Sequence, residues 1–321
     1  MGETKRRRFL IGVGALLAAS VGAWAQQAKK TRIGMLFASN PEPGRRLILE
    51  GLRKLGYVDG QNIQVEFRSA DGKPGLLPGL AAELVRLKVD VILAVATPAV
   101  HAAKQATNQI PIVMAPAGDP VGTGLVASLA RPGGNVTGLS ATTAESTNKL
   151  LEFIRELLPQ ANRVGVLANP TDPFTKPFLE QIDAAARALK VETRTIMIGG
   201  GEEFDAAFAE LHKIRAGAVI VQPSLPRQRA IELALQYRLA SFSPTPTFPQ
   251  AGGLLSYSAG YSDMYYEAAT YVDKIVKGRK PAELPVQQPM RFELVINLKT
   301  AGALGLKIPR RILVLADKLI E

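Results

Sequence analysis

The sequence predicts an α/β protein with two open, parallel β-sheets, and three observations indicate this fold class. From Thr31 onward, short apolar runs alternate with segments of helical spacing. Several of these runs are nearly continuous in Val, Ile, Leu and Ala, which is typical of parallel strands buried on both faces. A turn-rich break at 131–135 (RPGGN) follows the fourth run, and we expect a domain crossing there. Eight strands in a single closed barrel are the alternative.

The predicted strands and helices follow one another along the chain in regular order. The strands are expected at 32–38, 62–68, 89–96, 111–117, 135–141, 163–169, 192–198 and 216–222. One helix begins near Ala144 and ends before Pro159. Two further helices are predicted from apolar residues that share one face, namely Phe178, Ile182 and Leu189 in the first, and Phe204, Phe208 and Leu211 in the second. Strand–helix–strand units of this kind form parallel sheets covered by helices on both sides.

Composition places the chain among ordinary globular proteins and excludes several chemistries. Its 321 residues suggest two domains at about 150 residues each. With 47% hydrophobic and 21% charged residues, it can bury a core. The absence of cysteine excludes disulfides, thiol catalysis and cysteine–zinc sites, and only two histidines occur, His101 and His212. We therefore expect no metal and no cofactor.

Residues 1–25 have the three parts of a cleavable export signal. A basic stretch, Lys5 to Arg8, precedes an apolar segment at 9–21, and the cleavage site follows Ala25. The segment 6–10 (RRRFL) also fits the twin-arginine pattern. The apolar segment is shorter than the ~20 residues that a membrane anchor needs. Without a cysteine for lipid attachment, the exported chain is predicted to be a soluble periplasmic protein.

The positive charge of the chain does not by itself point to nucleic acid. The formal net charge is +11, and removing the +3 of residues 1–25 leaves +8 for the remainder. The basic residues are scattered, with no basic run and no interleaved aromatic side chains. We interpret them as a solvated surface, and expect no nucleic-acid partner.

Polar residues recur where the predicted strands end, often next to a proline. In open α/β sheets, ligands bind beyond the carboxyl ends of the strands. Each of these residues could simply cap the following helix, but a row of capped helix ends could also hold a small polar solute. The residues at these strand ends are Ser39, Asn40, Thr97, Asp119, Asn169 and Ser224.

Motifs of catalysis and nucleotide binding are missing. The sequence contains no phosphate-binding loop of the G-x-x-x-x-G-K-S/T type and no G-x-S-x-G nucleophile elbow. The glycines of Gly122-Thr123-Gly124 lack the third glycine of a dinucleotide-binding fingerprint. We therefore expect a binding protein rather than an enzyme.

The chain from about residue 32 to its end resembles the exported solute-binding components of ABC importers. The resemblance is to those with the type I periplasmic-binding-protein fold, in the tryptophan/tyrosine-binding-like branch. It is carried by the segments 55–62 (LGYVDGQN), 80–85 (LAAELV), 118–126 (GDPVGTGLV), 130–138 (ARPGGNVTG), 251–257 (AGGLLSY) and 292–301 (FELVINLKTA).

This resemblance implies two Rossmann-like lobes that close on a small solute by hinge motion and present it to a membrane permease. It implies lobe I at 31–139 plus 259–285, and lobe II at 140–258 plus 286–321. Ser39, Thr97 and Asp119 would line the cleft from lobe I. Asn169, Ser224 and Phe248 would line it from lobe II, with Tyr257 near a crossing. Thr137, in the fifth predicted strand, is also a candidate.

The residues limit the ligand only in part. Asp119 could pair with an ammonium group, and Phe248 and Tyr257 could stack on a ring. We expect an amino acid or a related small metabolite, aromatic ones included, bound by a monomer. A binding partner of a membrane sensor is one alternative, and an exported α/β enzyme is another.

Overall fold

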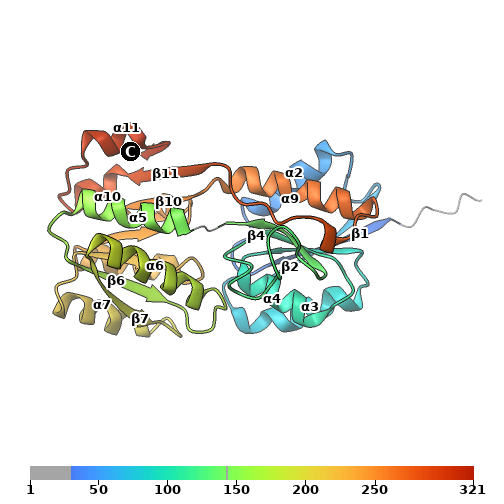
Figure 1. Ribbon diagram of the computed structural model, residues 1–321, viewed down its shortest axis with the longest axis horizontal. Coiled ribbons are helices and arrows are strands. Elements are labelled where there is room, and N and C mark those ends of the chain that lie inside the picture. Colours follow the sequence, from blue (N-terminus) through green and yellow to red (C-terminus); the bar gives the residue numbers. More distant parts are fainter. Residues whose placement is uncertain (1–29, 142–143) are drawn as a thin grey trace, which may run out of the picture.

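The computed structural model describes residues 30–141 and 144–321, so the predicted signal at 1–25 lies outside the described residues. The described chain forms two lobes side by side along the long axis of the molecule, each built around its own sheet (Figure 1). None of the helices in this part combines the length and apolarity needed to cross a membrane.

Lobe I contains a five-stranded parallel sheet in the order β2-β1-β3-β4-β5. Its strands are β1 (Thr31–Phe37), β2 (Ile63–Ser69), β3 (Val91–Val95), β4 (Ile112–Ala117) and β5 (Val136–Ser140). Helices α2 (Gly44–Lys54) and α9 (Tyr261–Val276) cover one face. Helices α3 (Leu77–Arg86) and α4 (Thr97–Ala106), with the short 3-10 turn η1 (Pro74–Leu76), cover the other.

The apolar sequence of β1 explains why helices cover both faces of this sheet. Successive side chains of a strand point to opposite faces. Ile33, Met35 and Phe37 therefore pack with α2 and α9, while Leu36 packs with α3 and α4. All four side chains are at most 2% exposed, as expected for a strand in the interior of a parallel sheet.

Lobe II contains a seven-stranded sheet in the order β12-β11-β10-β9-β8-β6-β7. The strands are parallel except for the antiparallel pair β10–β11. Their bounds are β6 (Arg163–Ala168), β7 (Glu192–Met197), β8 (Ala218–Val221), β9 (Ala240–Ser243), β10 (Leu255–Ala259), β11 (Phe292–Asn297) and β12 (Lys318–Ile320).

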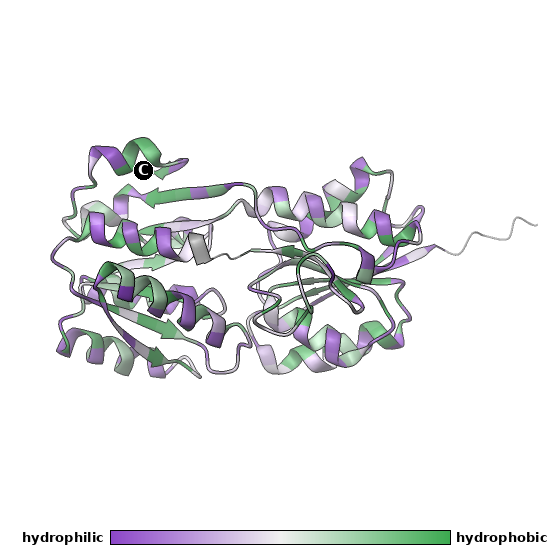
Figure 2. Cartoon of the chain, viewed as in Figure 1, coloured by the Kyte–Doolittle hydropathy of each residue, from purple (hydrophilic) through white to green (hydrophobic). Residues whose placement is uncertain are grey.

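Helices also cover both faces of the second sheet. On one face lie α5 (Ala144–Leu157), α6 (Thr175–Leu189), α10 (Leu298–Ala303) and α11 (Arg310–Leu315). On the other lie α7 (Glu203–Lys213) and α8 (Arg227–Gln236). The short turns η2 (Pro249–Ala251) and η3 (Pro281–Glu283) complete the described elements. Apolar residues gather on the strands and on the inner faces of the helices, as Figure 2 shows.

The sequence-based predictions of strands and helices are largely confirmed. Each of the eight predicted strands is present, and both sheets are open, which excludes the barrel alternative. Phe204, Phe208 and Leu211 are completely buried on one face of α7. Helix α5 ends at Leu157, two residues before Pro159.

Four strands of lobe II, β9 to β12, were not predicted from the apolar runs. Strands β9 (ASFS) and β10 (LSYSA) alternate serine with apolar residues, so they lack a continuous apolar run. Strand β12 has three residues and is mostly exposed. These strands form by pairing with neighbours: β9 pairs with β8, β10 with β9, β11 with β10, and β12 with β11.

The chain passes between the sheets later than the break at 131–135 suggested. Strand β5 pairs with β4, so this break lies within lobe I and the first passage follows Ser140. The second passage is at Gly260, between β10 and α9, and the third is at 288–291, before β11. Gln287 exchanges backbone hydrogen bonds with Gly138 and Ser140, which places the first and third passages side by side.

Candidate solute-binding site

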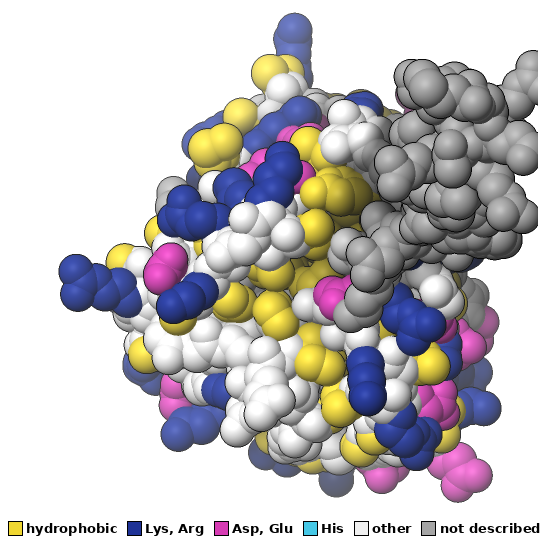
Figure 3. Space-filling model, turned by 90° about the vertical axis from the view of Figure 1, so that its right-hand side faces the viewer, with side chains coloured by type: hydrophobic (Ala, Val, Ile, Leu, Met, Phe, Trp, Pro, Cys, Tyr) yellow, Lys and Arg dark blue, Asp and Glu magenta, His cyan; other side chains and the backbone are white. Residues whose placement is uncertain are grey.

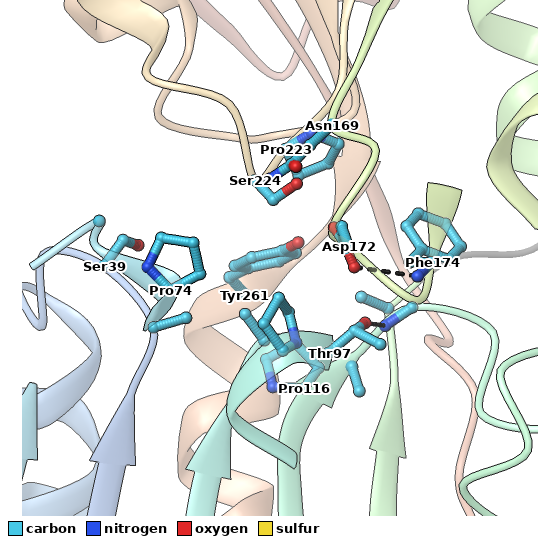
Figure 4. Close-up of a pocket in the computed structure, with 17 residues that line it drawn as sticks. Ser39, Pro74, Thr97, Pro116, Asn169, Asp172, Phe174, Pro223, Ser224 and Tyr261 are labelled. Atoms are coloured by element: carbon cyan, nitrogen blue, oxygen red, sulfur yellow. Dashed lines mark hydrogen bonds between the residues drawn. The ribbon is translucent and has the colours of Figure 1, made fainter. Parts of the chain in front are cut away.

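A pocket lies between the lobes at the carboxyl ends of their strands (Figure 4). It encloses about 690 Å³, its open mouth included. Lobe I contributes the ends of β1, β3 and β4 and the first residue of α9, while lobe II contributes the segments after β6 and β8. The lining residues are Ala38, Ser39, Gly72, Pro74, Ala96, Thr97, Pro98, Pro116, Ala117, Gly118, Ala141, Asn169, Asp172, Phe174, Pro223, Ser224 and Tyr261.

Thr97 joins two strand ends on the lobe I side of the pocket. It is the first residue of α4, and Pro98 occupies the first helical turn, where its missing N–H costs no hydrogen bond. The Oγ1 atom of Thr97 accepts a 2.9 Å hydrogen bond from the backbone N–H of Gly118, just beyond β4. Thr97 is only 4% exposed, so this contact fixes the wall of the pocket.

Asp172 is the acidic side chain of the pocket, and the loop after β6 holds it in place. Its side chain is 6% exposed. Oδ1 accepts a 2.9 Å hydrogen bond from the backbone N–H of Phe174, and Oδ2 accepts one of 3.0 Å from Nε2 of Gln222. Gln222 follows β8, and its Oε1 accepts hydrogen bonds from the backbone of Asn169 and from Thr175. Gln222 thus links the Asp172 carboxylate to Asn169 and Thr175 and fixes its orientation.

Burial raises the pKa of Asp172 above its usual value, because the carboxylate has lost solvent. Contacts with Ser224, Phe174 and Gln222 and the charge of His101, on α4 of lobe I, oppose this shift. No lysine or arginine is among the lining residues of the pocket. A ligand cation beside Asp172 would therefore supply the charge compensation that the described residues provide only weakly.

Ser224 presents a buried hydroxyl to the same space. Its Oγ atom has no hydrogen-bond partner among the described residues. It lies close to the Asp172 carboxylate, but not in hydrogen-bonding geometry. Buried polar atoms are nearly always paired, so an unpaired hydroxyl in a pocket indicates a place for a ligand or water.

Tyr261 and Phe174 supply the aromatic surface of the pocket. Tyr261 lies at the centre of the lining residues, between the two lobes (Figure 4). Burial raises the pKa of Tyr261 to about 12, so its phenol stays protonated and can donate a hydrogen bond at neutral pH. Phe174 of lobe II packs on Gly118 of lobe I, where an added Cβ would lie 2.9 Å from three ring atoms.

The structure brings four of the predicted site residues to this pocket: Ser39, Thr97, Asn169 and Ser224. Asn40 and Asp119 lie outside the lining. Asn40 is exposed, and its Oδ1 accepts from the backbone N–H of Glu42. Asp119 turns back on its own loop, where Oδ1 accepts a 2.9 Å hydrogen bond from the N–H of Gly122. The carboxylate in the pocket is that of Asp172 instead.

The remaining predicted residues, Thr137, Phe248 and Tyr257, do not line this pocket and pack within the lobes instead. Thr137 is fully buried in β5, where its Oγ1 donates a 2.6 Å hydrogen bond to the carbonyl of Leu284. Phe248 is 1% exposed in the core beneath α7 and α8. Tyr257 stacks on Phe292 with ring centroids 5.6 Å apart and packs against the core of lobe II.

Sequence reasoning missed Asp172, Phe174 and Tyr261 as lining residues. The segment Asn169–Phe174 contains two polar–proline pairs, Asn169-Pro170 and Asp172-Pro173, and only the first was selected. The second pair is the signal that could have identified Asp172. Tyr261 follows Gly260 at a passage between lobes that no apolar run marks.

The described residues contain no group of three or more His, Cys, Asp or Glu side chains placed to hold a metal ion. The pocket instead combines one carboxylate, several hydroxyls, proline rings and two aromatic rings. Two lobes with such a pocket between them form the architecture of a solute-binding protein.

Comparison with known proteins defines the family. Residues 44–320 match the model of the ABC transporter substrate binding protein family, and the chain belongs to this family. A curated tyrosine-binding protein from Clostridioides difficile (strain R20291) is 28% identical over 271 residues, covering 83% of this chain and 77% of the relative. The predicted family and fold are therefore confirmed.

Two solved structures are similar over nearly the whole chain. A conserved domain protein from Vibrio cholerae superposes with a TM-score of 0.86 at 27% identity, covering 91% of this chain and 100% of that one. An ABC domain from Streptococcus pneumonia in complex with L-Trp superposes with a TM-score of 0.83 at 26% identity, with the same coverage. The family captures small solutes and delivers them to ABC permeases.

Proposed function

We propose that this chain captures an amino acid, or a close relative of one, that carries an aromatic ring, and that Asp172 binds its ammonium group. The observation that carries the proposal is a buried carboxylate in a pocket without lysine or arginine. A carboxylate in such a place is stabilised by a cation that forms charge-assisted hydrogen bonds with it.

The neighbouring groups suit an ammonium ion and a ring. Ser224 Oγ can accept a further ammonium hydrogen atom, since it has no partner among the described residues. Tyr261 and Phe174 offer aromatic faces, and Pro74, Pro116 and Pro223 offer apolar edges. The similar proteins named for tyrosine and for bound L-Trp support an aromatic ligand.

The cellular setting is part of the same proposal. Residues 1–25 would direct export by the twin-arginine route, and the processed chain would act in the periplasm without a lipid anchor. In place of the bounds that the resemblance implied, we assign lobe I to 31–140 plus 261–287, and lobe II to 144–259 plus 292–321. The processed protein would act as a monomer, without catalytic activity.

No nucleic acid is expected as a partner. On the end of lobe I that Figure 3 shows, lysine and arginine side chains are interspersed with acidic and uncharged ones. Such a mixed surface supports solubility rather than phosphate binding.

A melting-temperature panel tests the proposal. The processed chain is heated with a reporter dye in the presence of amino acids, aromatic acids, sugars, purines and peptides. A ligand at ~100 times its dissociation constant adds about 2.7 kcal/mol to the stability, a shift of several degrees. Shifts with aromatic amino acids, and intact ligand afterwards, are the expected result. Shifts confined to sugars or purines would contradict the proposal, and consumption of the ligand would indicate an enzyme.

A further inference from the structure

Arg227 is a half-buried cation without a carboxylate partner. It is the first residue of α8 and follows Ser224 of the pocket by three positions. Its Nη1 donates a 2.7 Å hydrogen bond to Oγ1 of Thr247, which leaves most of the guanidinium donors free. No Asp or Glu among the described residues forms an ion pair with it, in contrast to Arg229, which pairs with Asp205 and Glu232.

Arg227 lies at the carboxyl edge of the lobe II sheet, because it follows β8 and its hydrogen-bond partner Thr247 follows β9. Its charge lowers the pKa of Tyr265 on α9, against the rise that burial of the phenol causes. Tyr265 lies one helical turn beyond Tyr261, and their ring centroids are 6.1 Å apart. Since Ser224 lines the pocket from the same edge of the lobe II sheet, Arg227 lies beside the pocket.

Burial also lowers the pKa of Arg227, which reflects the cost of removing a cation from water. A guanidinium in such a place is stabilised by an anion, and its planar fork matches a carboxylate with two parallel hydrogen bonds. The pocket lining itself holds no cationic side chain. A ligand that carries both an ammonium and a carboxylate group would therefore find its two counter-charges on lobe II, at Asp172 and Arg227.

We propose that Arg227 binds the carboxylate of the solute and makes the site select amino acids over the corresponding amines. This assignment rests on the proposed function, because it concerns the same ligand. Arg227 acts after the lobes have approached, when Tyr265 and Tyr261 enclose the carboxylate end of the ligand. A purely conformational role, in which Arg227 holds the lobes together against Tyr265, is the competing explanation.

The test compares each amino acid with its decarboxylated amine. L-Tryptophan and tryptamine, and L-tyrosine and tyramine, are titrated calorimetrically into the processed chain and its variants. Arg227→Met removes the charge but keeps a long side chain. Arg227→Lys keeps the charge but loses the planar guanidinium that can donate two parallel hydrogen bonds. Arg229→Met, on the same helix, is the matched control. Melting temperatures of all variants show that they are folded.

Wild type should bind the amino acid at least ~tenfold more tightly than the amine. This affinity ratio is expected from one hydrogen bond between charged groups. Arg227→Met should lose this preference by weakening the amino acid alone, Arg227→Lys should keep part of it, and Arg229→Met should keep all of it. Equal weakening of acid and amine would overturn the assignment in favour of the conformational role. An unchanged preference in Arg227→Met would also overturn it. If wild type binds no member of the ligand panel, the proposed function fails first and this assignment fails with it.

Discussion

Asp172 is the residue on which ligand recognition depends most directly. The Phe174 amide and the Gln222 side chain hold its carboxylate, and no lysine or arginine lines the pocket around it. Asp172→Asn keeps the shape but removes the charge. We expect this substitution to lower the affinity for an aromatic amino acid by about tenfold to a hundredfold, as measured by calorimetry. This is the range expected for the loss of a hydrogen bond to a charged group.

Asp119→Asn is the control for this substitution. Asp119 also follows a strand of the sheet edge, but its side chain accepts from Gly122 within its own turn. Ligand affinity should therefore be unchanged in Asp119→Asn. If Asp119→Asn loses affinity while Asp172→Asn keeps it, Asp119 rather than Asp172 binds the ammonium group.

The pH dependence of stability provides a second prediction for Asp172. Burial raises its pKa above the ordinary 3.8, so the folded chain keeps a proton that the unfolded chain has already released. The contribution of Asp172 to stability is therefore most favourable below about pH 3.8 and falls as pH rises through the raised pKa. Without ligand, the melting temperature of Asp172→Asn relative to wild type should rise across this window. A difference that shrinks with rising pH would show that the site stabilises the ionised form.

At the residue scale, some of the residues selected at strand ends line the pocket and others do not. Ser39, Thr97 and Ser224 line the pocket because residues just after parallel strands meet at one sheet edge. Asp119 follows a strand equally closely, but its positive φ of 26° and its hydrogen bond to Gly122 turn the carboxylate away. Local backbone conformation of this kind is not visible in residue order.

At the scale of elements, the start of α6 meets the end of β4 across the two lobes. An added Cβ at Gly118 would lie 2.9 Å from Phe174 ring atoms, so Gly118→Ala must displace the ring. Overpacking costs about 1–3 kcal/mol. Here it would destabilise the state in which Gly118 of lobe I contacts Phe174 of lobe II. We expect weaker ligand binding by calorimetry. Gly134→Ala is the control, since no atom lies within 4 Å of its added Cβ. Unchanged affinity in Gly118→Ala would contradict a role for this contact in closure.

Strand β5 provides a test that separates structure from binding. Thr137 donates from its buried hydroxyl to the carbonyl of Leu284, which precedes the third passage between lobes. Thr137→Val leaves that carbonyl without this donor, and should cost about 1–3 kcal/mol of stability. The melting temperature should fall by several degrees while ligand affinity stays unchanged. A loss of affinity without a loss of stability would instead identify Thr137 as a ligand residue.

The elements that the sequence predicted well are those with strong apolar patterns. Strands such as β4 (IVMAPA) are buried on every residue, and α7 buries Phe204, Phe208 and Leu211 on one face. Strands β9 and β10 alternate serine with larger residues, and their strand conformation depends on neighbours distant in sequence. Pairing with such partners, rather than local pattern, decides these strands.

For the whole molecule, composition and alternation predicted two open sheets, but the passages between them depend on tertiary contacts. The backbone of Gln287 pairs with that of Gly138 and Ser140, which brings distant segments together between the lobes. The turn-rich break at 131–135 is not the first passage, because β5 follows it and still pairs with β4 of lobe I. A structure with three such passages is suited to a hinge motion in which each lobe moves as a unit.

Capture of an aromatic amino acid through its ammonium group is the central claim, and one calorimetric comparison tests it most directly. L-Tyrosine and 3-(4-hydroxyphenyl)propionate, which lacks the amine, are titrated into the processed chain at neutral pH. The account predicts one site per chain for L-tyrosine and at least ~tenfold weaker binding of the propionate. Equal binding of the two, or binding of the propionate alone, would contradict the account.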